Sequence, residues 1–146
     1  MTPPSDPSSV YLDSNALIYL MQGRPGYEDV AQTLTAARGG KLNLYISTLS
    51  YVEVRGYGND EPYPAERDKA TMNLLDDPSL TLVEFSRGVA LEARRIAHTY
   101  RLKNPDAIHV ASALYAEAEV LFTSDQQLKS RGLIEGVHIA EPYPIG

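Results

Sequence analysis

The chain of 146 residues contains no cysteine and no long apolar run, and these absences limit its chemistry. Without cysteine, disulfides and thiolate metal sites are excluded, so carboxylates and the three histidines are the candidate ligands for any ion. No apolar stretch reaches the roughly 18 residues of a membrane span, and residues 1–9 lack the basic and apolar regions of a secretory signal. The sequence therefore predicts a cytoplasmic protein with no membrane association, and it favours hard metal ions with oxygen ligands.

Basic charge is also scarce, except in one segment. The net charge of −6 argues against unselective coating of nucleic acid, because such binding neutralises many phosphates. Residues 87–103 reverse this balance, since Glu92 is their only acid. Their basic residues are Arg87, Arg94, Arg95, Arg101 and Lys103. This segment is either a solvated helix face or an RNA-binding surface that contacts phosphates, with Arg94, Arg95, Arg101 and Lys103 as the candidates.

The order of apolar patterns predicts one α/β domain over residues 9–140, with flexible tails at 1–8 and 141–146. The content of 43% hydrophobic residues is enough for a real core. Strands are expected at 10–12, 41–47, 80–85, 119–124 and 136–141, and helices at 16–21, 26–40, 48–57, 64–77, 86–101, 105–118 and 125–132. Helices between successive strands predict a three-layer domain, with a five-stranded parallel sheet flanked by helices on both faces.

Asp13 lies where the first predicted strand meets the first predicted helix. The segment "DSN" offers Asp13, Ser14 and Asn15, each of which can cap a helix by accepting a backbone N–H bond. A single cap is sufficient, so two interpretations are open for the polar side chains. They are either capping residues or part of a site, because parallel sheets bind ligands at the carboxyl ends of their strands.

Three further acids lie at comparable positions. Asp125 follows the predicted strand 119–124, Asp106 lies near the start of a helix, and Glu53 follows the second strand. Each alone is explained by capping, by the helix dipole or by solvation. Together they fall at positions that an α/β sheet brings to one edge. Two carboxylates about 4 Å apart repel by about 4 kcal/mol at an effective dielectric near 20, so the cluster predicts a bound cation, Mg²⁺ or Mn²⁺.

Four segments carry a resemblance to a known family. In order, "VYLDSNALIYL", "STLSYVEV", "NPDAIHVASAL" and "LFTSDQQL" resemble the acidic motifs of PIN-domain ribonucleases, especially the VapC-like toxins of type II toxin–antitoxin systems. The resemblance implies a five-stranded parallel sheet and Mg²⁺- or Mn²⁺-dependent cleavage of RNA. It also implies a small antitoxin partner and a homodimer. The implied active site consists of Asp13, Glu53, Asp106 and Asp125, with Asn15 and Thr123 as supporting residues.

The chemistry of these residue types agrees with an endoribonuclease. One or two metal ions held by Asp13, Asp106 and Asp125 would lower the pKa of a bound water and orient it toward a phosphodiester. Glu53 either binds a metal or orients the water. His109, one turn after Asp106, is expected to be a buried structural residue rather than a ligand.

Two alternatives remain open. The chain is either a catalytically idle PIN-like module that binds protein or RNA, or a phosphatase with an aspartate nucleophile. The phosphatase is disfavoured because Asn15 stands where that chemistry usually has a second acid, two residues after Asp13. The apolar run at residues 17–21 is too broad for one helix stripe, so part of it is a candidate contact with a second chain.

Overall fold

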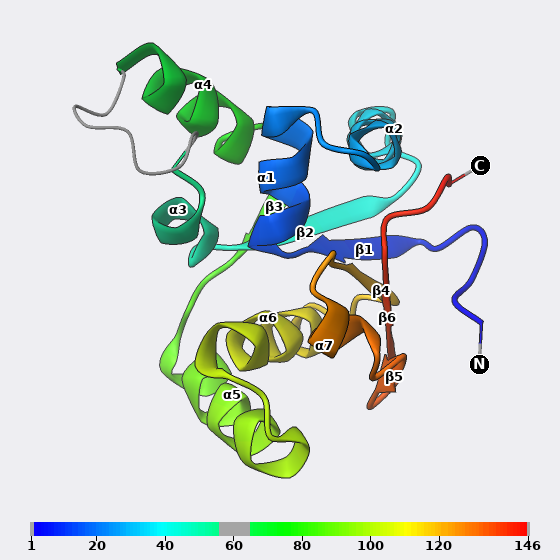
Figure 1. Ribbon diagram of the computed structural model, residues 1–146, viewed down its shortest axis with the longest axis vertical. Coiled ribbons are helices and arrows are strands. Elements are labelled where there is room, and N and C mark those ends of the chain that lie inside the picture. The colour runs from blue at the N-terminus through cyan, green and yellow to red at the C-terminus, as the bar shows by residue number, and fades with distance from the viewer. Residues whose placement is uncertain (1, 56–64, 146) are drawn as a thin grey trace.

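A single twisted sheet forms the middle of the molecule (Figure 1). The computed structural model describes residues 2–55 and 65–145. Within these ranges the strands are β1 (Ser9–Leu12), β2 (Asn43–Ser47), β3 (Leu80–Val83), β4 (Val120–Phe122), β5 (Leu133–Ile134) and β6 (Val137–Ala140). Their order across the sheet is β3-β2-β1-β4-β6-β5, and every neighbouring pair is parallel except β5 and β6.

Helices cover both faces of the sheet. They are α1 (Ser14–Gln22), α2 (Tyr27–Arg38), α3 (Ser50–Glu53), α4 (Ala65–Leu75), α5 (Arg87–Tyr100), α6 (Asn104–Tyr115) and α7 (Gln126–Lys129). Figure 1 shows α1, α2 and α4 on one side of the sheet and α5, α6 and α7 on the other. None of the helices in the described ranges has the length and apolar character that a membrane span requires.

The alternation of side chains along the strands builds a separate core on each face. In β1, Val10 and Leu12 join the cluster beneath α1, α2 and α4, whereas Tyr11 joins the cluster beneath α5 and α6. In β4, Phe122 joins the cluster beneath α1, α2 and α4, and Leu121 joins the cluster beneath α5 and α6. Because helices cover both faces of the sheet, successive residues of a strand are apolar and buried, as Val10, Tyr11 and Leu12 are. The predicted three-layer α/β domain is confirmed.

The predicted number of strands was one too low. β5 turns back on β6 through Glu135 and Gly136, which have φ values of 49° and 93°. Two successive residues with positive φ are typical of the tight turns that join hairpin strands. A strand of two residues carries no periodicity, so only the glycine of this turn was available as a sequence signal.

The helix expected at 48–57 is also shorter than predicted. Its helical part is the single turn α3, and Val54 already has an extended backbone, with φ −98° and ψ 101°. β-branched Val52 and Val54 favour extended over helical conformations, which accounts for the early end. The rest of this segment from residue 56, and the turn expected at 58–64, lie outside the described residues.

Both chain ends contact the domain at specific points. The Tyr143 hydroxyl donates to the Pro4 carbonyl oxygen at 2.6 Å, so the two tails meet each other. The Ser8 backbone N–H donates to Glu119 Oε1 at 2.9 Å, and Ile145 is buried among the residues of the first core. The flexibility of residues 1–8 and 141–146 stays a prediction.

Ser86 provides a test of the local rules that shape the helices. It caps α5, because its Oγ accepts a hydrogen bond from the Val89 N–H at 3.2 Å. We expect Ser86→Ala to lower the free energy of unfolding by about 1 kcal/mol, since one N–H of the first turn loses its partner. Ser86→Asp retains an acceptor and serves as the control in urea unfolding. Equal losses in both variants would contradict the capping role.

Candidate active site

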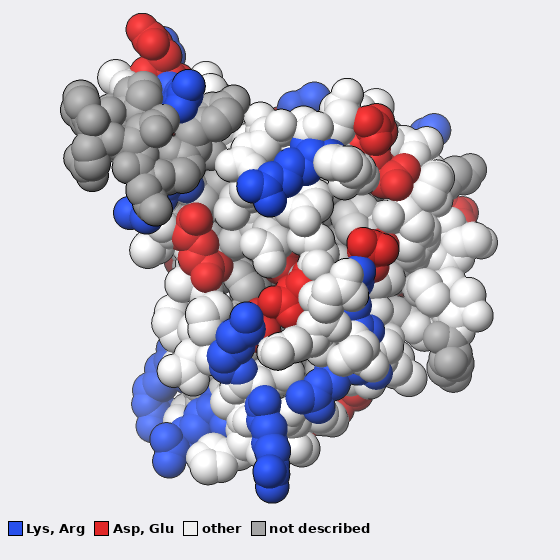
Figure 2. All heavy atoms as spheres, viewed as in Figure 1, with Lys and Arg blue, Asp and Glu red and all other residues white. Residues whose placement is uncertain are grey.

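Acidic side chains meet at the carboxyl ends of two adjacent strands. Asp13 directly follows β1, Asp125 follows β4 by three residues, and these strands pair in parallel. Asp106 lies in the first turn of α6, and Glu53 ends α3. Figure 2 shows acidic atoms gathered in the middle of one face, with basic side chains below and beside them. The structure therefore brings elements that are far apart in sequence to one end of the sheet, as the site prediction requires.

Asp13 is the most deeply buried of these acids. Only 3% of it is exposed, and its Oδ1 accepts the Ala16 N–H at 2.9 Å, so it caps α1. The pKa of Asp13 is raised from 3.8 to about 6, chiefly by burial and to a smaller extent by the nearby charge of Asp106. Hydrogen bonds from Thr123 and Ala16 oppose this rise. Capping does not require burial, because an exposed aspartate caps equally well, so the position of Asp13 needs a second explanation.

Lys103 lies against the other two aspartates. Its Nζ is 3.3 Å from Asp125 Oδ2 and 4.0 Å from Asp106 Oδ2. Burial and the charge of Asp125 raise the pKa of Asp106. The pKa of Asp125 is lowered instead, chiefly by a hydrogen bond from the Leu128 N–H and then by Lys103. An ammonium group already occupies part of the space in which the sequence predicts a cation.

Glu53 is held by two hydrogen bonds to a single oxygen. Its Oε1 accepts the Ser14 hydroxyl at 2.7 Å and lies 2.7 Å from His109 Nε2. Partial burial raises the pKa of Glu53, but the hydrogen bonds from His109 and Ser14 lower it below its usual value overall. The four acids therefore differ in their electrostatics. The raised pKa values belong to Asp13 and Asp106, and those of Glu53 and Asp125 are lowered.

Sequence reasoning missed several residues of the site. Ser14 was interpreted as a possible cap, but its Oγ bonds to Glu53 and lies 3.0 Å from Ser50 Oγ. His109 is buried, as expected, and its Nδ1 lies 2.7 Å from the hydroxyl of Tyr11. Ser14 stands next to Asp13 in the sequence, which was the one available signal. Nothing local indicated that Tyr11 or Ser50 takes part.

Comparison with known proteins agrees with this geometry. The family model of the PIN domain matches residues 10–132. The chain belongs to the PIN-domain family. This confirms the family suggested by the four motifs. Comparison with curated protein sequences gave no match.

Solved structures with the same PIN fold cover nearly the whole chain. A toxin–antitoxin complex from Klebsiella pneumoniae has 27% sequence identity and a TM-score of 0.67, and the alignment covers 94% of this chain and 100% of that one. DNA-bound VapBC from Salmonella typhimurium has 19% identity and a TM-score of 0.67, with coverage of 92% and 98%. VapBC2 from Rickettsia felis, bound to a promoter DNA fragment, has 16% identity and a TM-score of 0.65, with coverage of 89% and 96%.

The donors of this PIN domain fit a hard divalent cation. Within residues 2–55 and 65–145, no three Asp, Glu or His side chains are close enough together to hold a metal ion as they stand. Carboxylate oxygens are nevertheless the ligands that Mg²⁺ and Mn²⁺ prefer. The charge of Asp106 raises the pKa of Asp13, and the charge of Asp125 raises that of Asp106. Thr123 connects two of them, since it hydrogen-bonds Asp13 and its Oγ1 accepts the Asp125 N–H at 3.0 Å. Asn15, the other supporting residue, is exposed at the start of α1.

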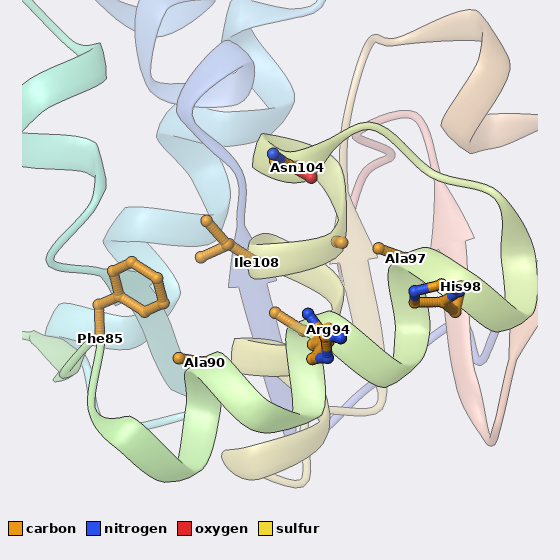
Figure 3. A pocket seen from close by; sticks show the side chains of 9 residues that line it. Phe85, Ala90, Arg94, Ala97, His98, Asn104 and Ile108 are labelled. Carbon is orange, nitrogen blue, oxygen red and sulfur yellow. The ribbon is translucent and has the colours of Figure 1, made fainter.

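A cleft of about 360 Å³ lies between α5 and α6 (Figure 3). Its polar lining comes from Arg94, His98 and Asn104, and Phe85 and Ile108 contribute apolar surface. Among the described residues, no carboxylate lines this cleft. Asn104 stands two residues before Asp106, so one end of the cleft lies close to the start of the acidic site.

The structure separates the four basic residues that the sequence groups together. Arg95 is engaged by two acids, with its guanidinium 2.7 Å from Glu135 and 2.5 Å from Glu92. Lys103 contacts the acidic site, and Arg101 ends α5 with a φ of 54°. Arg94 is exposed and lines the cleft. Arg94 is therefore the best placed of the four for a ligand in the cleft.

The raised pKa of Asp13 predicts a pH-dependent effect on stability. We expect Asp13→Asn to stabilise the metal-free protein at pH 7.5 by up to about 3 kcal/mol, because the folded wild type there holds a buried charge. The amide still caps α1. The gain shrinks as the pH falls from 6 toward 4, because the carboxyl of the folded wild type then takes up a proton.

Urea unfolding at pH 7.5 and 4.5 measures this effect, with Asp125→Asn as the matched control. The pKa of Asp125 is lowered, so its substitution should decrease stability at pH 7.5. A gain for Asp13→Asn that does not change with pH, or equal gains in both variants, would show that burial of Asp13 has no electrostatic cost.

Proposed function

We propose that this PIN domain is a metal-dependent endoribonuclease that uses water as its nucleophile. The observation that supports this most directly is the buried Asp13, beside Asp106 and Asp125 at one end of the sheet. Burial of a carboxylate among like charges is costly unless a cation compensates. A site of this kind, with oxygen donors only, suits hydrolysis of phosphodiesters better than chemistry at a protein nucleophile.

In this mechanism Asp13, Asp106 and Asp125 hold Mg²⁺ or Mn²⁺. When bound, the ion supplies an activated water and stabilises charge on the phosphate. The protein positions the ligands, since Asp13 is fixed by the Ala16 N–H and by Thr123. Lys103 balances the charge of the acids before RNA binds, and its flexible ammonium is a ready partner for a phosphate oxygen. Asn15 is exposed and is proposed to hydrogen-bond a water or the substrate.

We also propose that the protein is the VapC-like toxin of a toxin–antitoxin pair, with a small antitoxin partner and a homodimeric state. The similarity to a toxin–antitoxin complex at 27% identity supports this assignment. Apolar side chains at the surface of α3 and α4 offer a contact area, because Val52 is 70% exposed and Met72 is 36% exposed. Of the apolar run expected to face another chain, Leu17 is fully buried, whereas Ile18 and Met21 are only partly buried.

RNA binding by the cleft between α5 and α6 is part of the proposal. Arg94 and His98 offer hydrogen bonds to phosphate oxygens, and Phe85, with 46% exposed, offers a surface on which a base can stack. Because Arg94 lines this cleft and no carboxylate does among the described residues, the cleft is our candidate for RNA contact in a protein with a net charge of −6. A protein partner in the same cleft is the competing outcome.

The first test is cleavage itself. Asp13→Asn and Asp106→Asn should each abolish cleavage of RNA in the presence of Mn²⁺, because an amide preserves shape but loses the charge that holds the ion. Gel analysis of fragments measures cleavage, and circular dichroism confirms that both variants are folded. EDTA should stop the wild type. Cleavage that persists in EDTA would exclude the metal mechanism. A wild type that binds Mn²⁺ and RNA without cleaving would point to the idle binding module.

Two neighbouring arginines test the RNA surface. Arg94→Ala should weaken RNA binding and reduce the slope of affinity against salt by about 1, since one phosphate contact is lost. Arg95→Ala is the matched control, because its guanidinium is already engaged by Glu92 and Glu135 and should contribute little to RNA affinity. Fluorescence anisotropy with labelled RNA at several salt concentrations measures both, using Asp106→Asn protein to prevent cleavage. Equal effects of the two substitutions would remove the cleft from the proposal.

A further inference from the structure

A chain of hydrogen bonds runs from the core of the sheet to Glu53. The Tyr11 hydroxyl lies 2.7 Å from His109 Nδ1, and His109 Nε2 lies 2.7 Å from Glu53 Oε1. Ser14 Oγ also donates to this oxygen at 2.7 Å, and Ser50 Oγ is 3.0 Å from Ser14. All of these residues except Glu53 are buried, with Tyr11 and Ser50 at 0% exposure.

The direction of each bond follows from the chemistry of the groups. A carboxylate only accepts, so His109 Nε2 carries the hydrogen that lies toward Glu53. In a neutral imidazole Nδ1 is then an acceptor, and the Tyr11 hydroxyl must donate to it. Ser14 gives its hydrogen to Glu53 and therefore accepts from Ser50. Ser14 Oγ also lies 3.3 Å from His109 Nε2, and Nε2–H is the donor there too, because the hydrogen of Ser14 is given to Glu53. These bonds together assign the hydrogen of His109 to Nε2 and hold Glu53 in place.

This arrangement leaves the two oxygens of Glu53 unequal. Oε1 accepts two hydrogen bonds, whereas Oε2 accepts none from the residues that the structure describes. A buried polar side chain is costly unless it has hydrogen-bond partners. A position that only filled the core would therefore favour an apolar residue over a histidine. The partners of His109 here are a core tyrosine, a site glutamate and, at 3.3 Å, the hydroxyl of Ser14.

We propose that Tyr11 and His109 are positioning residues that fix Glu53 so that Oε2 is left to accept a hydrogen bond from a water or a ribose hydroxyl of the RNA. The inference rests on the proposed ribonuclease function. Neither residue touches the substrate, because both are buried behind Glu53. Their contribution is therefore to orientation, and it should appear in kcat rather than in KM.

The tautomer of His109 is tested on the metal-free protein, without any activity. Two-bond ¹H–¹⁵N correlation spectra distinguish an imidazole protonated at Nε2 from one protonated at Nδ1. We expect the Nε2–H form in the wild type near neutral pH. The Nδ1–H form would overturn the proposal, because that imidazole cannot donate to Glu53 through Nε2.

Single substitutions test the effect on catalysis. Tyr11→Phe removes only the hydroxyl and should lower kcat about fivefold, with KM little changed, as for the loss of one hydrogen bond. Tyr45→Phe is the matched control, since Tyr45 is the registered partner of Tyr11 on β2 and lies outside the hydrogen-bond chain. Tyr45→Phe should leave kcat unchanged.

His109 is tested by two variants of different chemistry. His109→Leu should lower kcat by about tenfold or more, whereas His109→Gln retains an N–H donor for Glu53 and should recover most of this loss. Thermal unfolding of each variant distinguishes a loss of stability from a loss of the correct orientation of Glu53. If kcat follows only thermal stability, or if Gln is no better than Leu, the positioning role is wrong. If the wild type cleaves no RNA, the proposed function fails, and the tautomer measurement still decides whether the hydrogen-bond chain exists.

Discussion

The carboxylate of Asp13 is enclosed at the end of the central strand, and the surrounding groups are arranged as this burial requires. A charge removed from water needs hydrogen bonds or an opposite charge nearby. The α1 backbone and Thr123 supply the hydrogen bonds. No opposite charge lies directly on Asp13 among the salt bridges of the described residues, and its pKa is raised as a result. Within the described residues, Asp13 is thus a buried acid without a salt-bridge partner.

Around this carboxylate the four acids divide into two pairs with different electrostatics. The pKa values of Asp13 and Asp106 are raised, chiefly by burial, while Glu53 and Asp125 are stabilised as anions by hydrogen bonds. The division has a structural origin, because Asp125 caps α7 and Glu53 is bonded by His109 and Ser14. The two raised groups are therefore those that would gain most from a bound divalent ion.

The sequence predicted the architecture and the positions of the acids because both depend on local patterns. Predicted strand ends and helix starts place Asp13, Asp106 and Asp125 without knowledge of the tertiary structure. The partners of His109 were beyond such reasoning. Tyr11 and His109 are 98 residues apart, and their contact depends on which face of β1 the tyrosine occupies and how α6 packs against it. β5 was missed for a different reason, because two residues are too few to show a period.

The short hairpin of β5 and β6 has a consequence for the edge of the sheet. Its turn residue Glu135 is bonded by Arg95 and by the Tyr100 hydroxyl, so α5 is tied to the outermost strand. An exposed strand edge invites pairing with a strand of another molecule. Here that edge is only two residues long and is fastened to a helix, which makes it a poor template for such pairing. The contact of α5 with this hairpin thus limits strand pairing at the β5 edge of the sheet.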